Sequence, residues 1–241
     1  MFTFPLRHGD ERLGALDLYR DVPGPFNAKA MVAAQTLADV AAAYMLNAQA
    51  RSDLVEASHR SAARALRDAL TGLPNRTALL EHLDRAVRRS KRSGRTTAVL
   101  FTDLDRLKGV NDRHGHGVGD ELLVAVAARL VATKRAEDTL ARLYGDEFAM
   151  VCEGIEDRAE ADQIAQRIRR AIAQPFELSS TTLSITASVG VALTDTTDQS
   201  PQQLLDRSDA AMYVAKRRGG AQVQVGHSNG SSANEGLHPG R

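Results

Sequence analysis

One stretch of the sequence restricts the fold more than any other, because it holds neither glycine nor proline. It runs from Phe26 to Thr71 and is rich in alanine. Within it, apolar residues recur at the spacing of one helix face; they are Val32, Leu37, Val40, Ala41 and Tyr44. The pattern predicts one long helix, or two helices in line, with Asn27 as a suitable N-cap.

The second half of this stretch is more polar than the first and is predicted to be a connector. A weak heptad seam passes through Leu54, Ala62 and Leu66. Such a seam suits a parallel contact between two helices, and the polar residues around it suit a single exposed helix equally well. The sequence leaves both interpretations open.

The chain changes character after the connector. Gly72 and Pro74 end the helix, and Asn75 is placed to cap another. Strand-like and helix-like segments then alternate in the order αβααββαβαβ, which predicts an α/β (α+β) domain with a mixed sheet. The expected helices include 75–87, 120–130, 159–173 and 201–217, and the expected strands are 99–101, 140–143, 148–151, 183–191 and 223–225. Glycines 115, 117 and 119 are interpreted as a loop that Asp120 ends by capping the next helix.

Acidic side chains stand at the ends of two predicted strands that are far apart in the sequence. The apolar run 99–101 leads to Asp103 and Asp105, and Gly145-Asp146 marks a tight turn in a predicted β-hairpin. Carboxylates brought together from two strand ends are suited to hold a hard divalent cation and a nucleoside triphosphate. Aspartate is also common in exposed turns, so two solvated turns are the alternative.

Bulk composition excludes several classes of protein. The net charge is +1 and aromatic residues make up 4% of the chain, which offers neither the field nor the stacking surface that nucleic-acid binding needs. The single cysteine, Cys152, excludes an internal disulfide framework and suits a reducing compartment. No apolar run reaches the roughly 18 residues of a membrane span. A protein of the cytoplasm is expected.

Four separated motifs together resemble the GGDEF domain of the diguanylate cyclase family. They are the joint 68–76, the block 103–120, the segment 135–148, and Tyr213-Val214-Ala215-Lys216. The resemblance covers residues 68 to about 225 and implies a mixed central sheet wrapped by helices, related to the palm of nucleotide cyclases. It also implies the reaction, in which two GTP molecules condense to cyclic di-GMP and release two pyrophosphates. One domain holds one GTP, so the resemblance implies a homodimer.

The same resemblance assigns catalytic and metal-binding roles. Asp103 and Asp146 would hold two Mg²⁺ (or Mn²⁺) ions, with the Leu104 carbonyl as a further ligand. Glu147 lies beside them and would assist, and deprotonation of the 3′-hydroxyl is assigned near Asp146 or to water. Lys216 would contact the phosphates.

Further residues would bind the substrate. Asn111 and Asp120 match the pair that reads guanine, because an amide and a carboxylate can recognise its N1, N2 and N3 edge. Lys108 matches a second phosphate-binding lysine. Gly145 of the signature turn and Arg142 just before it complete the implied GTP site.

The resemblance also implies an inhibitory site and shows three departures. Arg135 and Asp138 have the Arg-x-x-Asp form of the site that binds the product, cyclic di-GMP. Tyr144 replaces the first glycine of the signature, where a phenol would obstruct the nucleotide or strain the turn. Leu107 replaces a usual Phe, and Gly220 a usual Arg. The expected activity is a diguanylate cyclase; the alternative is a weak or inactive domain that binds GTP or cyclic di-GMP as a signalling module.

The N-terminal residues give a second, partial resemblance. The strand-like run from Leu13 to Tyr19, after a turn at Gly9-Asp10, and the alanine-rich helix resemble the end of a GAF sensor domain; an N-terminal cap on the main domain is the alternative. The expected organisation is a partial GAF-like segment at 1–48, a connector helix at 49–70, a GGDEF domain at 71–226 and a disordered tail at 227–241.

Overall fold

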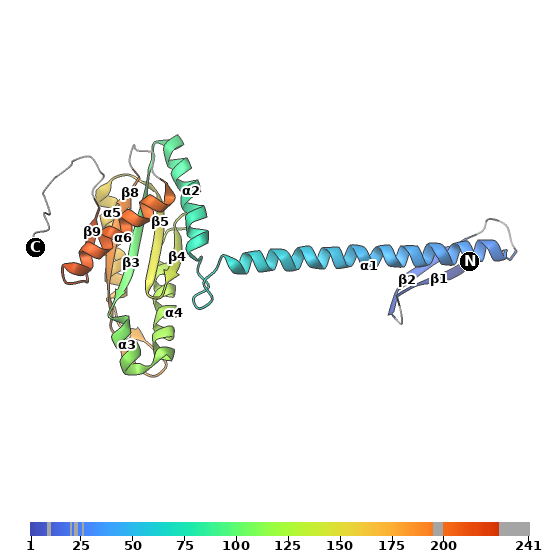
Figure 1. The fold of residues 1–241 in the computed structure, drawn as a ribbon, viewed down its shortest axis with the longest axis horizontal. Coiled ribbons are helices and arrows are strands. Elements are labelled where there is room, and N and C mark those ends of the chain that lie inside the picture. Colours follow the sequence, from blue (N-terminus) through green and yellow to red (C-terminus); the bar gives the residue numbers. More distant parts are fainter. Residues whose placement is uncertain (9–10, 20, 22–23, 26, 195–199, 227–241) are drawn as a thin grey trace, which may run out of the picture. The chain divides into compact units, whose positions relative to one another are not determined.

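The computed structural model describes residues 1–8, 11–19, 21, 24–25, 27–194 and 200–226, and within the long helix it leaves out the side chains of 55 and 57–63 (Figure 1). The predicted turn at Gly9-Asp10 and the predicted tail at 227–241 lie outside the described residues. The chain divides into two compact units, residues 1–65 and residues 66–241. Among the described residues, none of the helices combines the length and the apolar character that crossing a bilayer requires.

The first unit is a β-hairpin packed on one long helix. Strand β1 (Phe2–His8) pairs antiparallel with β2 (Glu11–Leu18), and α1 spans Ala28–Ala65 as a single helix. Asn27 caps it as predicted, since the Asn27 side chain accepts a hydrogen bond of 2.7 Å from the backbone N–H of Ala30. The sequence did not predict β1, which contains Pro5.

Small residues of α1 face the hairpin. Ala34, Ala38 and Ala42 are buried against Phe4 and Leu6 of β1. The larger apolar residues of the predicted helix face point to solvent instead: Val32, Leu37, Val40 and Tyr44 are all more than 60% exposed. Alanine lets helix and sheet approach closely, so the bulky residues are left on the outer faces.

The predicted heptad seam is only partly present on α1. Leu54 is exposed on the helix, the side chain of Ala62 is outside the described part, and Leu66 lies beyond the last helical residue. The helix therefore ends a few residues before the predicted break at Gly72 and Pro74.

The second unit has the mixed sheet and flanking helices that were predicted (Figure 1). The strands lie in the order β4-β5-β3-β8-β9; all neighbours are antiparallel except β8 and β9, which are parallel. They span Thr96–Asp105 (β3), Thr139–Tyr144 (β4), Glu147–Ile155 (β5), Thr186–Leu193 (β8) and Val223–Val225 (β9). A small hairpin, β6 (Phe176–Glu177) with β7 (Thr182–Leu183), precedes β8.

Helices cover both faces of this sheet because residues alternate along its strands. Val99 and Phe101 of β3 face α2 (Arg76–Ser93) and α6 (Pro201–Arg217) in one hydrophobic core. Leu100 and Leu104 face the other core, which includes α4 (His116–Thr133) and α5 (Arg158–Ile172). The short helix α3 (Leu107–His114) joins β3 to α4.

One glycine sets the distance between α6 and the sheet. A Cβ on Gly190 of β8 would lie 2.0 Å from the Ser208 carbonyl and 2.1 Å from the Met212 nitrogen. No side chain fits there, so the backbones of β8 and α6 are in direct contact.

Candidate active site

Carboxylates from two separate segments meet at one end of the sheet. In the pairing of β3 with β5, Asp103 lies opposite Glu147. Asp146 precedes Glu147 in the turn between β4 and β5, and the backbone N–H of Leu104 donates a 3.3 Å hydrogen bond to the Asp146 carbonyl. The two acidic segments that the sequence singled out are therefore side by side.

Asp103 is the most enclosed of these acids. Its side chain is buried, and the Lys216 ammonium from α6 lies 2.5 Å from its Oδ1. Burial raises the pKa of Asp103 above its usual value, Lys216 offsets part of the rise, and the charge of Asp146 adds to it. Apart from the ion pair with Lys216, Oδ1 accepts no hydrogen bond from the described residues.

Glu147 shares this negative environment. Burial raises the pKa of Glu147, and the nearby charges of Asp103, Asp209 and Asp146 raise it further. Carboxylates that raise one another's pKa bind a cation favourably, because the cation removes their mutual repulsion.

These acids fit a divalent cation only if the substrate phosphates and water supply the remaining ligands. Across the part of the chain that the structure describes, no three His, Cys, Asp or Glu side chains gather closely enough to hold a metal. Mg²⁺ is commonly held by one or two carboxylates while substrate phosphates and water complete its octahedron. The buried carboxylate of Asp103, whose Oδ1 has only the Lys216 ammonium as a partner among the described residues, lies close to the charge of Asp146 and matches that kind of site.

Asp105 has a structural position that the sequence did not assign. Its carboxylate accepts hydrogen bonds from the hydroxyls of Thr186 (2.7 Å) and Ser188 (2.8 Å) and from the backbone N–H of Ala221 (3.0 Å). It thereby ties the end of β3 to β8 and to the loop that follows α6. Gly220 in that loop has a φ of 72°, and a Cβ there would lie 3.2 Å from Asp105 Oδ1. The arginine usual at this position would therefore start beside Asp105.

Asn111 and Asp120 come together where α3 meets α4. A Cβ on Gly119 would lie 1.8 Å from Asn111 Oδ1, so the Asn111 amide rests on the backbone next to Asp120. This corrects the predicted loop: Gly117 and Gly119 lie inside α4, which starts at His116, and Asp120 is within the helix and does not cap it. Gly119 is required for close approach and not for a turn. Asn111 Oδ1 is buried and accepts no hydrogen bond within the described part, which leaves it free for a donor on a ligand.

The two remaining substrate candidates differ in their surroundings. Lys108 is exposed on α3. The Arg142 guanidinium is already engaged: Nη1 lies 2.9 Å from Asp68 Oδ1, and Nε donates a 2.9 Å hydrogen bond to the Gly145 carbonyl. Arg142 thus joins the segment before α2 to the signature turn, and its contact with GTP stays a prediction.

Tyr144 does not strain the turn, contrary to one of the two effects expected from it. Among the described residues, a positive φ occurs in this turn only at Gly145, where φ is 46°. Tyr144 ends β4 and is 65% exposed, beside a small pocket of about 150 Å³ that Glu147 and Asp209 also line. The expected obstruction of the nucleotide stays a prediction.

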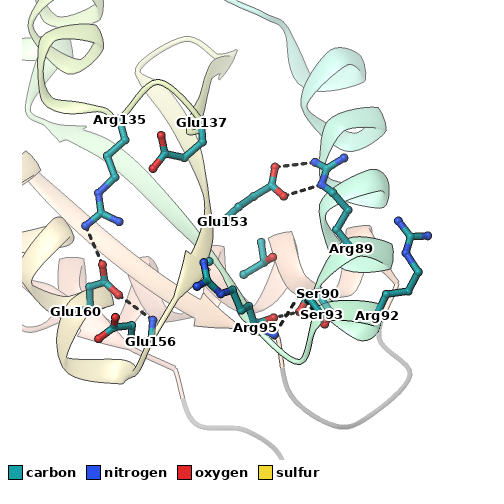
Figure 2. Close-up of a pocket in the computed structure, with 12 residues that line it drawn as sticks. Arg89, Ser90, Arg92, Ser93, Arg95, Arg135, Glu137, Glu153, Glu156 and Glu160 are labelled. Atoms are coloured by element: carbon teal, nitrogen blue, oxygen red, sulfur yellow. Dashed lines mark hydrogen bonds and ion pairs between the residues drawn. The ribbon is translucent and has the colours of Figure 1, made fainter.

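Arg135 and Asp138 form a compact turn. The Arg135 N–H donates a 2.8 Å hydrogen bond to Asp138 Oδ2, and the Asp138 side chain is buried. The Arg135 guanidinium points into a pocket of about 760 Å³ between α2, β5 and α5, where it contacts Glu160 (Figure 2).

Comparisons with known proteins agree with this geometry. The family model described as "Diguanylate cyclase, GGDEF domain" matches residues 65–222. The bifunctional diguanylate cyclase/cyclic di-GMP phosphodiesterase MucR of Pseudomonas aeruginosa is 44% identical over 168 residues, which is 70% of this chain and 24% of MucR. The diguanylate cyclase TpbB of the same species is 41% identical over 156 residues, 64% of this chain and 36% of TpbB. The chain therefore spans about a quarter to a third of the length of these relatives.

Solved structures show the same fold. The GGDEF domain of TpbB superimposes with a TM-score of 0.65 at 39% identity, covering 67% of this chain and 94% of that one. The coiled coil and GGDEF domain of DgcB from Caulobacter crescentus, in complex with cyclic di-GMP, gives 0.69 at 30% identity, covering 76% and 97%. On these matches, this chain belongs to the diguanylate cyclase, GGDEF-domain family.

Proposed function

We propose that this chain is a diguanylate cyclase, which joins two GTP molecules into cyclic di-GMP and releases two pyrophosphates. One observation carries the proposal: Asp103, Asp146 and Glu147 converge from two distant segments at one end of the sheet, with the Lys216 ammonium among them. Carboxylates and a lysine at one end of the sheet suit the handling of a triphosphate with divalent cations, when the phosphates and water complete the metal coordination.

Guanine recognition falls to the α3–α4 junction. The buried Asn111 Oδ1 accepts no hydrogen bond from the described residues, and Asp120 directly follows Gly119, on whose backbone the Asn111 amide rests. A guanine edge supplies N–H donors to both groups. Lys108 and Lys216 then stand on α3 and α6 as cations for the phosphates.

The chemical step is an in-line displacement at phosphorus. The 3′-oxygen of one GTP bonds to the α-phosphorus of the other, the bond from that phosphorus to its bridging oxygen breaks, and pyrophosphate leaves. Asp146 and Glu147, or water beside them, take the 3′-hydroxyl proton. Asp103 and Asp146, with the Leu104 carbonyl, would hold two Mg²⁺ or Mn²⁺ ions, which neutralise charge on the phosphates. Lys216 leaves Asp103 and binds a phosphate oxygen.

The reaction requires two domains, and we propose a homodimer. Each domain offers one guanine-reading pair, while the product contains two guanines. The outer side of α1 supplies a surface for the contact, since Leu37, Val40 and Tyr44 are exposed at spacings of three and four residues. The buried single Cys152 suits the reducing cytoplasm, where GTP is found.

The test is incubation of the pure protein with GTP and Mg²⁺. Formation of cyclic di-GMP and pyrophosphate by the wild type, and its loss in Asp146→Ala with the melting temperature kept, is the expected result. Turnover retained in Asp146→Ala would contradict the assigned role of that carboxylate.

Tyr144 favours a second candidate function. A large exposed side chain stands where the signature has glycine, so a domain that binds nucleotide without turnover is the alternative. Titration calorimetry with cyclic di-GMP on the wild type and on Arg135→Ala tests it together with the proposed product site at Arg135 and Asp138. Binding that depends on Arg135, without product from GTP, identifies the receptor; no binding and no turnover identify an idle scaffold.

A further inference from the structure

The Arg135 guanidinium already has a carboxylate partner inside the chain. Arg135 Nη2 lies 2.7 Å from Glu160 Oε1 (Figure 2). Glu160 stands in the first turn of α5, whose N-cap Asp157 accepts a 2.8 Å hydrogen bond from the Glu160 N–H. The second carboxylate oxygen of Glu160 accepts a 2.8 Å hydrogen bond from the Glu156 N–H. The backbone therefore holds the Glu160 carboxylate in the place where it meets Arg135.

The surrounding pocket is lined by charges of both signs. Arginines and glutamates face it from α2, β5 and α5, and Figure 2 shows Glu153 joined to Arg89 as Glu160 is joined to Arg135. A phosphate that binds Arg135 must therefore take its guanidinium from Glu160 or bind beside that carboxylate. Either event costs free energy that an isolated arginine would not impose.

We propose that Glu160 is an internal counter-ion that competes with cyclic di-GMP for Arg135 and so weakens product binding at this site. The inference rests on the proposed product site at Arg135 and Asp138. Arg135 and Glu160 remain 41% and 23% exposed in their side chains, so solvent screens the pair and the competition is modest. The hydrogen bond from the Glu156 N–H, and then the one from Arg135, lower the pKa of Glu160, so its carboxylate is charged at neutral pH.

The experiment is titration calorimetry of the full chain with cyclic di-GMP. Glu160→Gln keeps an oxygen that can accept from the Glu156 N–H but removes the charge. It should tighten binding about two- to fivefold, the range set by an exposed ion pair. Glu137→Gln is the matched control: it removes a charge from the same pocket without a hydrogen bond to Arg135, and should change affinity less than about 1.5-fold. Glu160→Ala is measured alongside, with melting temperatures for all variants.

Each outcome bears on one claim. Tighter binding in both Glu160 variants, lost again when Arg135→Ala is added, supports the inference. Arg135-dependent binding that is equal or weaker in both Glu160 variants, or an equal gain in Glu137→Gln, overturns the inference and leaves the product site standing. Cyclic di-GMP binding that is unchanged in Arg135→Ala, or no binding in any variant, overturns the product site and the inference with it.

Discussion

Replacing Arg142 with methionine should lower the free energy of unfolding of the second unit by about 2–3 kcal/mol. Arg142 Nη1 lies 2.9 Å and 3.2 Å from the two carboxylate oxygens of Asp68, and Nε donates to the Gly145 carbonyl. The Arg142 side chain is 11% exposed and that of Asp68 23%. An exposed pair is worth about 0–1 kcal/mol and breaking a buried pair costs about 3–5. The value lies between them because Asp68 keeps two hydrogen bonds from Thr71.

A double-mutant cycle isolates the pair itself. Urea unfolding followed by circular dichroism is measured for wild type, Arg142→Met, Asp68→Asn and the double variant, and the expected coupling is about 1–2 kcal/mol. Burial raises the pKa of Asp68, but hydrogen bonds from Thr71 and Arg142 outweigh it and leave the pKa lowered. A lowered pKa gives stability that is present above the unfolded-state pKa and is lost as the pH falls through the folded-state pKa.

The coupling should therefore persist at neutral pH and vanish in acid below the ordinary range of aspartate. A coupling below about 0.3 kcal/mol at neutral pH, which is within the error of additivity, would refute the reasoning. The same variants should lower turnover, because Arg142 also holds the turn that carries Asp146.

Four other predictions concern the site and the helix. Asp103→Asn should abolish product yet raise the free energy of unfolding by about 0.5–2 kcal/mol near neutral pH, since the raised pKa of Asp103 means that its ionised form opposes folding. This penalty is fully present above the folded-state pKa and absent below the unfolded-state pKa. The gain measured by urea unfolding should therefore shrink in acid. Gly119→Ala should displace Asn111 and weaken GTP binding about tenfold or more by calorimetry, at a stability cost of about 1–3 kcal/mol. Tyr144→Gly should raise the rate of product formation by relieving crowding. Leu37→Asp should shift the oligomer toward monomer in sedimentation and reduce turnover by the same fraction.

Matched measurements decide these four. Mg²⁺ should raise the melting temperature of the wild type and not of Asp103→Asn; equal rises would remove Asp103 from the metal site. Gly117→Ala, in open space on the same helix, is the control for Gly119→Ala, and equal losses would contradict the close-approach argument. An unchanged or lower rate in Tyr144→Gly counts against obstruction. A dimer that persists in Leu37→Asp would exclude that face of α1 as the dimer interface.

The sequence predicted the second unit well where local signals and periodicity agree. Helix 201–217 has the predicted bounds because Ser200 and Gln203 form a capping box, with Pro201 in the first turn between them. The convergence of Asp103 with Asp146 followed from strand ends that carry acids, and the structure brings them together.

Predictions from the sequence were weakest where the role of a residue depends on its contact with another element. Gly119 suggested a loop, but it serves to admit the Asn111 amide within a helix. The ion pair of Arg142 with Asp68, which lies before α2, had no signal in the sequence, while the predicted contact of Arg142 with GTP stays a prediction. The apolar spacing on α1 marked Leu37 and Val40, although Ala34, Ala38 and Ala42 are the residues that pack on the hairpin. The GAF-like interpretation of the first unit stays a prediction.

The contact at Gly190 has a consequence for how this family member can change over generations. Because α6 touches β8 through main-chain atoms at Ser208 and Met212, the height of the helix above the sheet does not depend on the size of any interposed side chain. Lys216 lies further along that helix, so this backbone contact sets the position from which its ammonium reaches Asp103. Neighbouring apolar residues can then drift in volume while the lysine stays in place, whereas a single methyl group at 190 would lift it away.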